Sequence, residues 1–278
     1  MTFSIVARDG DAWGVAVASR FLAVGSVVPE VASGTGAVAT QAMARYAYRA
    51  ELLASLAAGV PAGQALADAV AGDDGRGDRQ VGVVGGDGAA THTGSGCLPW
   101  AGGVSRGDRD SAYAIQGNIL TGPEVVAEME RAWLASAGRP LDHRLLAALL
   151  AGDAAGGDSR GRQSAALVAH APGAGYDHCG VLADLRVDDH PDAPSELARI
   201  HELHTLYFGA PEGVQPLEGA LRDEVTELLR GLQRGGPDAT VEAALEAWMG
   251  EVNLETRHAA GGIDSRVLDE LRRAGGAR

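Results

Sequence analysis

Residues 2–19, TFSIVARDGDAWGVAVAS, contain two short β-rich runs separated by a tight turn. The runs TFSIVARD (2–9) and AWGVAVAS (12–19) flank Asp9-Gly10-Asp11. An Asp-Gly pair between two such runs is a strong signal for a β-hairpin. We therefore predict a strand that starts at Thr2 and pairs at once with a second, antiparallel strand.

Beyond this hairpin, groups of strands alternate with groups of helices. Further strands are predicted at 36–41, 80–84, 89–93, 113–119, 164–171 and 181–187. Apolar residues at helical spacing predict helices at 49–58, 61–71, 123–137, 141–150 and 195–208. This order is typical of an α+β fold in which helices lie outside two antiparallel sheets.

A change of pattern near residues 209–215, GAPEGVQ, indicates a domain boundary. After it, short amphipathic helices are predicted at 217–232, 241–249 and 265–273. We therefore expect a domain over residues 1–211 and a small helical domain over 212–278.

The composition excludes several classes of function. A formal charge of -14 and a pI near 4.9 leave no basic face for nucleic acid or for an anionic membrane surface. Neither an export signal nor an apolar run long enough to span a membrane is present, so we expect a cytoplasmic protein. All 23 basic residues are arginine, which rules out lysine-dependent chemistry. Cys97 and Cys179 are expected to be buried thiols, because two cysteines make no disulfide framework.

Eight segments carry a resemblance to a known family. They are TFSIVARD, GVAVASRFLAVGSVVP, GAVATQA, RQVGVV, THTGSGCLPWAG, YAIQGNIL, GGDSRGRQSAALV and LRVDDHPDAP. In this order, over about residues 2–208, the chain resembles a bacterial family known as domain of unknown function 1028, within the N-terminal-nucleophile (Ntn) hydrolase superfamily. The tail, with PLEGALRDEVTELL and VNLETR, resembles a peptidoglycan-binding-like module. The resemblance implies an αββα four-layer sandwich whose nucleophile is the first residue of the first strand, and it implies no particular substrate.

The resemblance makes Thr2 the candidate nucleophile, provided that Met1 is removed. A free α-amine, with a pKa near 8, can take the proton of the threonine hydroxyl while Oγ attacks a carbonyl. Proteasome-type Ntn enzymes place a lysine beside the threonine, and this chain has none. The alternative is that Thr2 is only a β-forming residue at the start of a strand.

Ser19 and Arg20 end the second strand and are the expected polar partners of the Thr2 amine. Their Ala-Ser-Arg stretch resembles the Asp-Ser-Arg stretch of threonine-type Ntn enzymes, with Ala18 in place of the acid. Arg20 would hold a substrate carboxylate or lower the pKa of the amine. The alternative is an arginine in a buried ion pair.

Gln41 and Asn118 are candidate oxyanion donors, since each ends a predicted strand and carries an amide. The competing interpretation is a satisfied strand-end amide for Gln41, and a turn-closing side chain for Asn118. His92 would line the pocket, although a lone histidine in a strand is more often structural.

The loop GGDSRGRQS (156–164) concentrates charge before an apolar strand. Arg160, Arg162 and Gln163 are predicted to bind substrate, since arginine recognises carboxylates with paired N–H donors. Asp158 would orient an arginine or the Thr2 amine. The alternative is a network of arginine and aspartate confined to the loop.

Two further patterns carry no site. The acidic group DDHPD (188–192) fits no known metal-ligand spacing, and capping of the following helix is the better interpretation. Gly34-Thr35-Gly36 sits in no βαβ unit, so it is not a dinucleotide site.

Together these features favour an Ntn-type amidohydrolase that acts on a small amide or related acyl substrate, and the arginines of the 156–164 loop favour an anionic one. It would need no metal or organic cofactor, and we expect it to form a homo-oligomer. The alternative is a non-catalytic protein of the same fold that binds a small acidic metabolite or a cell-wall fragment.

Overall fold

The computed structural model describes residues 2–236 and 239–276. The chain divides into two compact units, residues 1–200 and 201–278. The expected boundary between residues 211 and 212 lies further along the chain, beyond the end of α5 (Ala193–Phe208).

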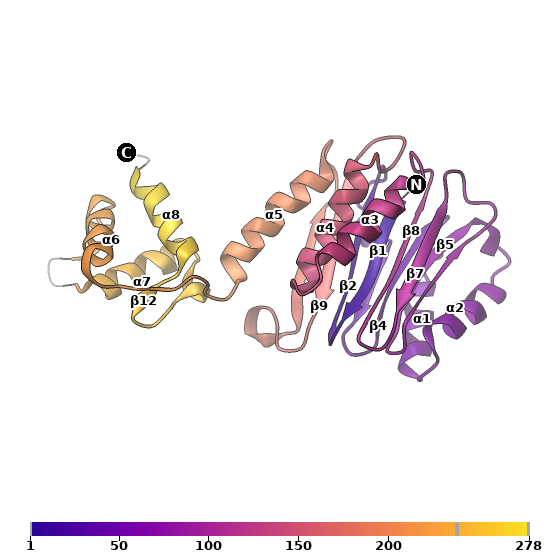
Figure 1. Cartoon of the computed structure of the whole chain (residues 1–278), viewed down its shortest axis with the longest axis horizontal. Coiled ribbons are helices and arrows are strands. Elements are labelled where there is room, and N and C mark those ends of the chain that lie inside the picture. Colours follow the sequence, from indigo (N-terminus) through magenta and orange to yellow (C-terminus); the bar gives the residue numbers. More distant parts are fainter. Residues whose placement is uncertain (1, 237–238, 277–278) are drawn as a thin grey trace. The chain divides into compact units, whose positions relative to one another are not determined.

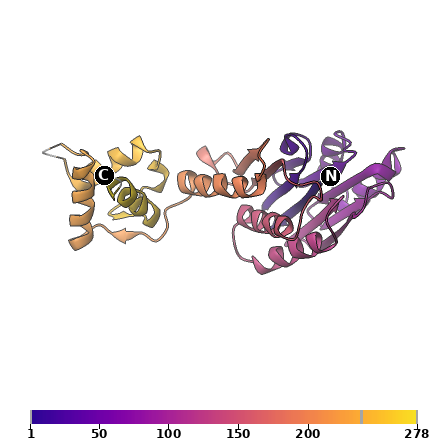
Figure 2. The same cartoon turned by 90° about the horizontal axis from the view of Figure 1, so that it is seen from above.

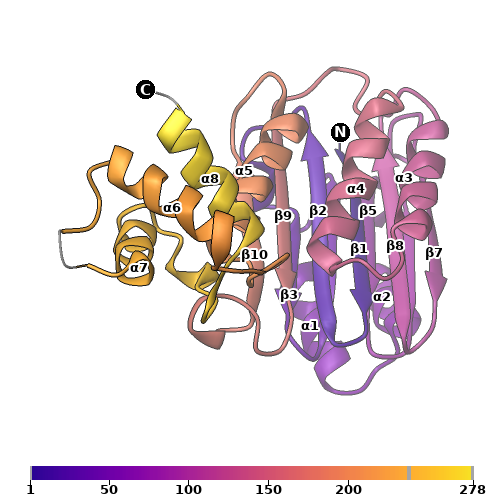
Figure 3. The same cartoon turned by 60° about the vertical axis from the view of Figure 1, so that its left-hand side comes forward.

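A six-stranded antiparallel sheet forms the first layer of strands in the first unit (Figure 3). In spatial order its strands are β10 (Val181–Val187), β9 (Ser164–His170), β2 (Ala12–Ser19), β1 (Thr2–Asp9), β8 (Ser111–Asn118) and β7 (Gly102–Gly107). The predicted hairpin is confirmed, because Asp9 pairs with Ala12 across a turn in which Gly10 has a φ of 57°. The strand that starts at Thr2 therefore lies in the middle of the sheet, between β2 and β8.

A four-stranded antiparallel sheet forms the second layer of strands. Its order is β3 (Pro29–Ala32), β4 (Gly36–Ala42), β5 (Arg79–Val84) and β6 (Ala89–Thr93). The sequence patterns did not predict β3 or β7. Both are edge strands, one short and headed by proline and the other rich in glycine, so their propensity for β structure is weak.

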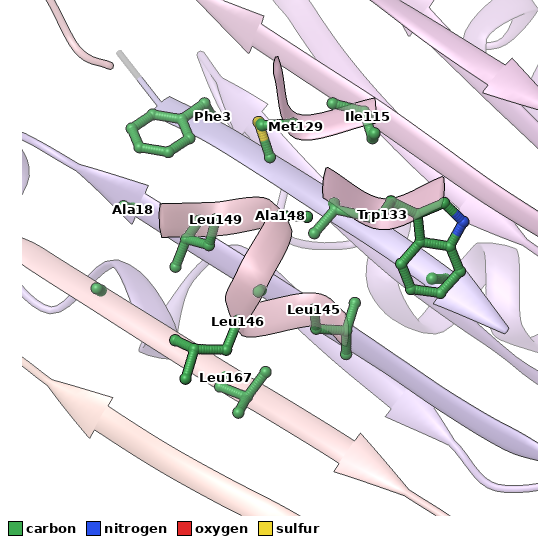
Figure 4. Close-up of a cluster of buried hydrophobic side chains, with 14 of the residues drawn as sticks. Phe3, Ala18, Ile115, Met129, Trp133, Leu145, Leu146, Ala148, Leu149 and Leu167 are labelled. Atoms are coloured by element: carbon green, nitrogen blue, oxygen red, sulfur yellow. The ribbon is translucent and has the colours of Figure 1, made fainter. Parts of the chain in front are cut away.

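Helices cover the outer faces of both sheets (Figure 1). The helices α1 (Tyr48–Ala57) and α2 (Ala62–Ala71) pack on the four-stranded sheet through Leu52, Leu56 and Leu66. The helices α3 (Glu124–Ala135) and α4 (Leu141–Ala154) cover the six-stranded sheet. Figure 4 shows the core beneath them, which contains Phe3, Ala18, Ile115, Met129, Trp133, Leu145, Leu146, Ala148, Leu149 and Leu167. The predicted α+β sandwich of four layers, helix, sheet, sheet and helix, is confirmed.

The layer between the two sheets is built mainly from small apolar side chains, with Trp13 as a larger member. Its buried members include Val6, Val15, Val17, Ala37 and Val84, all without solvent exposure. Valine and alanine fill a thin, closely packed space, which agrees with a composition rich in small residues.

The second unit contains the helices α6 (Gly219–Gly231), α7 (Val241–Glu251) and α8 (Ser265–Gly276), as predicted, together with the short strands β11 (Gln215–Pro216) and β12 (Gly262–Ile263) (Figure 2). Its core includes Val225, Trp248 and Leu271. Short 3-10 helices lie at Val24–Ser26, Arg76–Asp78, Tyr176–His178 and Glu255–Arg257. No helix in the described ranges is long and apolar enough to cross a membrane.

Candidate functional site

Thr2 lies at the end of the sandwich where the central strands of the larger sheet meet the loops. It begins β1, while β2 ends beside it at Ser19 and β8 ends at Asn118, its partner in register. Thr2 is 5% exposed, and its Oγ lies 3.1 Å from the Oγ of Ser19. The two predicted residues are therefore in contact. The expected removal of Met1 concerns a residue outside the described ranges.

A cluster of uncharged polar side chains fills the space between the sheets at this end. We call it the amide cluster, and its members are Ser4, Gln41, Gln80, Gln116 and Asn118, each at most 2% exposed. They come from strands of both sheets, and every one of them is hydrogen-bonded to another member.

The hydrogen bonds of the cluster run in one direction, which fixes the orientation of each amide. Gln116 donates to the Oγ of Ser4 at 2.7 Å, and Ser4 Oγ donates to Oε1 of Gln41 at 2.7 Å. Gln41 Nε2 and Asn118 Nδ2 both donate to Oε1 of Gln80 at 2.8 Å. Gln80 Nε2 in turn donates to the carbonyls and hydroxyl of neighbouring strands. A buried network satisfied in this way is rigid, because a rotated amide would leave a polar group unpaired.

The amide cluster ends on the main chain of Thr2. Gln41 Nε2 donates to the Thr2 carbonyl oxygen at 3.1 Å, and Asn118 Nδ2 approaches the same oxygen at 3.5 Å. The amide hydrogens of Gln41 and Asn118 are thus directed at Thr2 and at Gln80. In this arrangement they hold the first residue of β1 in place.

One glycine makes room for the cluster. A Cβ atom on Gly82, in β5, would lie 2.3 Å from Oε1 of Gln116. No side chain larger than hydrogen fits there without moving that amide. The space beside Gly82 is therefore shaped around the Gln116 amide.

Asp158 joins the loop before β9 to the strands on both sides of β1. Its Oδ2 accepts from the main-chain N–H of Arg20 at 2.8 Å. Its own backbone bridges Leu120, just after β8. Arg160 saturates the carboxylate, donating from its main-chain N–H and its guanidinium. Asp158 and Arg160 therefore form the network of arginine and aspartate that was the alternative interpretation of this loop. The network also holds the main chain of Arg20.

Arg20 and Arg162 are held differently from Arg160. Arg162 donates from Nε to Asp153 at 2.7 Å, and this carboxylate raises the pKa of the guanidinium. Arg20 donates from Nη1 to the carbonyl of Arg160 at 3.1 Å. Within the described ranges neither Nη1 nor Nη2 of Arg162 has a hydrogen-bond partner, and Arg20 forms no ion pair.

Two cavities lie next to each other at these arginines. The first, of about 220 Å³, is lined by both apolar and polar residues: Phe3, Ala18, Ser19, Asp153, Ala154, Gly156, Asp158, Gly161, Arg162, Ser164 and Pro194. The second, of about 460 Å³, is lined by Arg20, Gly161, Arg162, Gln163, Asp189, His190 and Pro191. They share Gly161 and Arg162. The first reaches Ser19, the residue that contacts Thr2.

The remaining predicted residues lie as follows. Gln163 lines the second cavity and donates to Asp189 at 3.1 Å. His92 bonds the carbonyl of Arg76 at 3.0 Å. Its neighbour Thr93 contacts Gln80, so His92 points to the opposite face of its strand.

Asp189, His190 and Asp192 of the acidic group at 188–192 have contacts with other residues. Besides the contact of Asp189 with Gln163, Asp192 lies 3.7 Å from Arg162. The expectation that both cysteines are buried is wrong for Cys179, which is exposed in an irregular loop between β9 and β10. Cys97 is half-buried, and burial raises the pKa of its thiol.

Sequence reasoning missed Ser4, Gln80 and Gln116. Each is a polar residue that directly precedes or follows a run of apolar residues in its strand, in SIVA, RQVGVV and YAIQGN. A polar residue on the buried side of a strand requires a partner, so this pattern was the available signal.

Comparison with known proteins gives one family. The profile of a family of unknown function (DUF1028) matches residues 2–197. The structure is similar to the crystal structure of a protein from Silicibacter pomeroyi described with the same family. The two chains share 29% sequence identity with a TM-score of 0.64, over 80% of this chain and 92% of that one. No protein with a curated description matches the sequence.

Proposed function

The chain belongs to the family of unknown function DUF1028, and from this premise we propose that it is an Ntn-type hydrolase that cleaves a small amide or related acyl substrate through Thr2. One observation carries the proposal. The buried apolar side chains between the sheets are mainly valine and alanine, with Trp13 among them, whereas the hydrogen-bonded amide cluster lies next to Thr2. A buried hydrogen-bonded network specifies one arrangement of its side chains more sharply than apolar packing does, so its concentration around one residue favours a positioning role.

In the proposed reaction Thr2 supplies both nucleophile and base. Its α-amine, freed by removal of the preceding residue, takes the Oγ proton as Oγ attacks the substrate carbonyl carbon. The tetrahedral intermediate collapses, the C–N bond breaks, and the leaving amine receives that proton. Water then attacks the ester on Thr2, giving the free acid and restoring the hydroxyl.

Ser19 and the amide cluster orient the reacting groups. The Ser19 hydroxyl, 3.1 Å from Thr2 Oγ, is placed to pass or hold the proton between Oγ and the amine. Gln41 and Asn118 hold the Thr2 carbonyl and so fix the main chain from which the hydroxyl projects. No lysine is needed for this arrangement.

The test is the intact mass of the untagged protein before and after exposure to a β-lactone, which acylates an activated hydroxyl. We expect the mass without Met1 and a single added lactone. Thr2→Ala should abolish the adduct and Thr2→Ser should retain it. Thr40→Ala is the matched control, because Thr40 is also a buried threonine at the end of a strand but bonds the carbonyl of Arg45 instead.

Retention of Met1, or an adduct that survives Thr2→Ala, would refute the proposal. Either result would favour the alternative, a non-catalytic protein of this fold that binds a small acidic metabolite or a cell-wall fragment.

A further inference from the structure

Around the two neighbouring cavities, three carboxylates are already hydrogen-bonded, whereas some guanidinium donors have no partner among the described residues. Asp158 is saturated by four N–H donors from Arg20 and Arg160. Asp153 and Asp189 each accept one hydrogen bond, from Arg162 and Gln163 respectively. Each of these carboxylates is therefore already bound to a donor of the protein itself.

The donors that remain belong to the two arginines. Arg162 uses only Nε, so the Nη1 and Nη2 hydrogens at the end of its guanidinium have no partner in the described part of the chain. Arg20 uses only Nη1, again counting described residues. Paired N–H donors of this kind match the two oxygens of a carboxylate.

The loop geometry brings both arginines to the cavity walls. Gly161, between Arg160 and Arg162, has a φ of 104°, a conformation that glycine adopts readily. A Cβ atom at this position would lie 3.4 Å from Nη1 of Arg20. The chain thus passes close to Arg20 and brings Arg162 to the wall shared by both cavities.

The size and lining of the first cavity limit the ligand. Its volume of about 220 Å³ is below the ~300–1,000 Å³ typical of pockets for drug-sized ligands, so the part of the ligand that enters this cavity is about the size of one amino acid. Phe3, Ala18 and Pro194 supply apolar contacts, while Ser19 lies beside Thr2.

We propose that Arg20 and Arg162 bind the carboxylate of the substrate, and that the substrate is therefore an amide of amino-acid size that carries a carboxylate, as in an N-acyl amino acid. The identity of the cleaved bond rests on the proposed function. The carboxylate rests only on the two cavities and their arginines. The two arginines of the loop therefore differ: Arg162 binds the ligand, whereas Arg160 serves Asp158.

Binding is measured by calorimetry with Thr2→Ala, so that no turnover occurs. The probes are N-acetyl-L-alanine and N-acetyl-L-alaninamide, which differ only in the carboxylate. We expect the acid to bind at least tenfold more tightly. Arg162→Gln should abolish this preference, and Arg162→Lys, which keeps the charge without the planar fork, should retain part of it.

The matched control is Arg106→Gln. Arg106 also donates from Nε to a carboxylate, that of Glu130 at 2.8 Å, but it lines neither cavity. It should keep the full preference for the acid. Equal binding of acid and amide, no binding of either, or the same loss in Arg106→Gln as in Arg162→Gln would overturn the inference. If the preference for the acid is absent but Thr2 is labelled normally by the lactone, the proposed hydrolase stands and the carboxylate site does not. If the preference is present but Thr2 is not labelled, only the carboxylate site stands.

Discussion

Replacement of Gln80 by leucine tests whether the amide cluster exists to hold Thr2. Gln80 Oε1 accepts from Gln41 and Asn118, and Nε2 donates to the Gly117 carbonyl at 2.8 Å and to Thr93 Oγ1 at 3.0 Å. Nε2 also approaches the Gly102 carbonyl at 3.3 Å, but it has only two hydrogens, so the loss is equivalent to four hydrogen bonds of about 1 kcal/mol each. Leucine recovers about 1 kcal/mol through its apolar surface, so we expect a net destabilisation of about 3 kcal/mol.

Hydrogen exchange measured by mass spectrometry reports this loss for the first unit alone. In peptides covering 2–9 and 111–118, about 3 kcal/mol corresponds to a roughly hundredfold loss of protection. Val15→Ala is the control, because Val15 is buried between the same sheets in their apolar part and its truncation costs about 2 kcal/mol. The rate of lactone labelling at Thr2 is then compared in both variants.

Gln80→Leu should slow labelling of Thr2 at least tenfold, whereas Val15→Ala should leave the rate unchanged. The reasoning is refuted if protection in Gln80→Leu equals that of the wild type, because the hydrogen bonds of Gln80 would then contribute nothing to stability. It is also refuted if Val15→Ala slows labelling as much, because general loosening of the sandwich would then explain the effect.

Two further predictions concern ionisable groups. Burial, with a hydrogen bond to Asp73, raises the pKa of Tyr48 to about 12, so the stability that this shift contributes is complete below pH 10 and is lost as pH rises toward 12. The urea midpoint of Tyr48→Phe should therefore fall less than that of the wild type between pH 9 and 11.5. The fall that remains is expected from Tyr113, whose pKa is also raised to about 12. Parallel pH profiles of the two proteins would contradict this prediction. Asp264→Ala leaves Arg257, which is 1% exposed, without its buried partner. Helix α8 should therefore lose about 3–5 kcal/mol of protection in hydrogen exchange. A change in exchange rate below tenfold would show that the pair is not buried as described.

The sequence was sufficient to predict the layers of the fold, because alternation of apolar residues and turn chemistry act locally. The Asp9-Gly10 turn determines the first hairpin, and the apolar spacing determines the helices on both outer faces. Local patterns failed at the edges, where β3 and β7 are strands because a neighbouring strand pairs with them and not because their residues favour it. The predicted helices of the second unit are likewise confirmed, since their amphipathic patterns are strong.

The site was only partly predictable, for a different reason. Alternation shows that Gln80 and Gln116 face the interior, but not which group they meet there. Gln41 and Gln80 are 39 residues apart in sequence, and Ser4 and Gln116 are 112 apart. Their contacts depend on the stacking of two sheets, which no local pattern encodes. Thr2 was singled out by the family resemblance, and Ser19 lies beside it because one hairpin joins their two strands.

The loop at 156–164 shows the same limit in a sharper form. Arg160 and Arg162 are the same residue type two positions apart, and nothing in their spacing distinguishes a structural arginine from a ligand-binding one. The structure distinguishes them by their partners: Asp158 takes the guanidinium of Arg160 and also fixes the main chain of Arg20. With that carboxylate saturated, the end of the Arg162 guanidinium remains beside a cavity that reaches Ser19. Hence a mutation of Arg160 should act through the position of Arg20, and a mutation of Arg162 through the ligand, although both remove one positive charge from one loop.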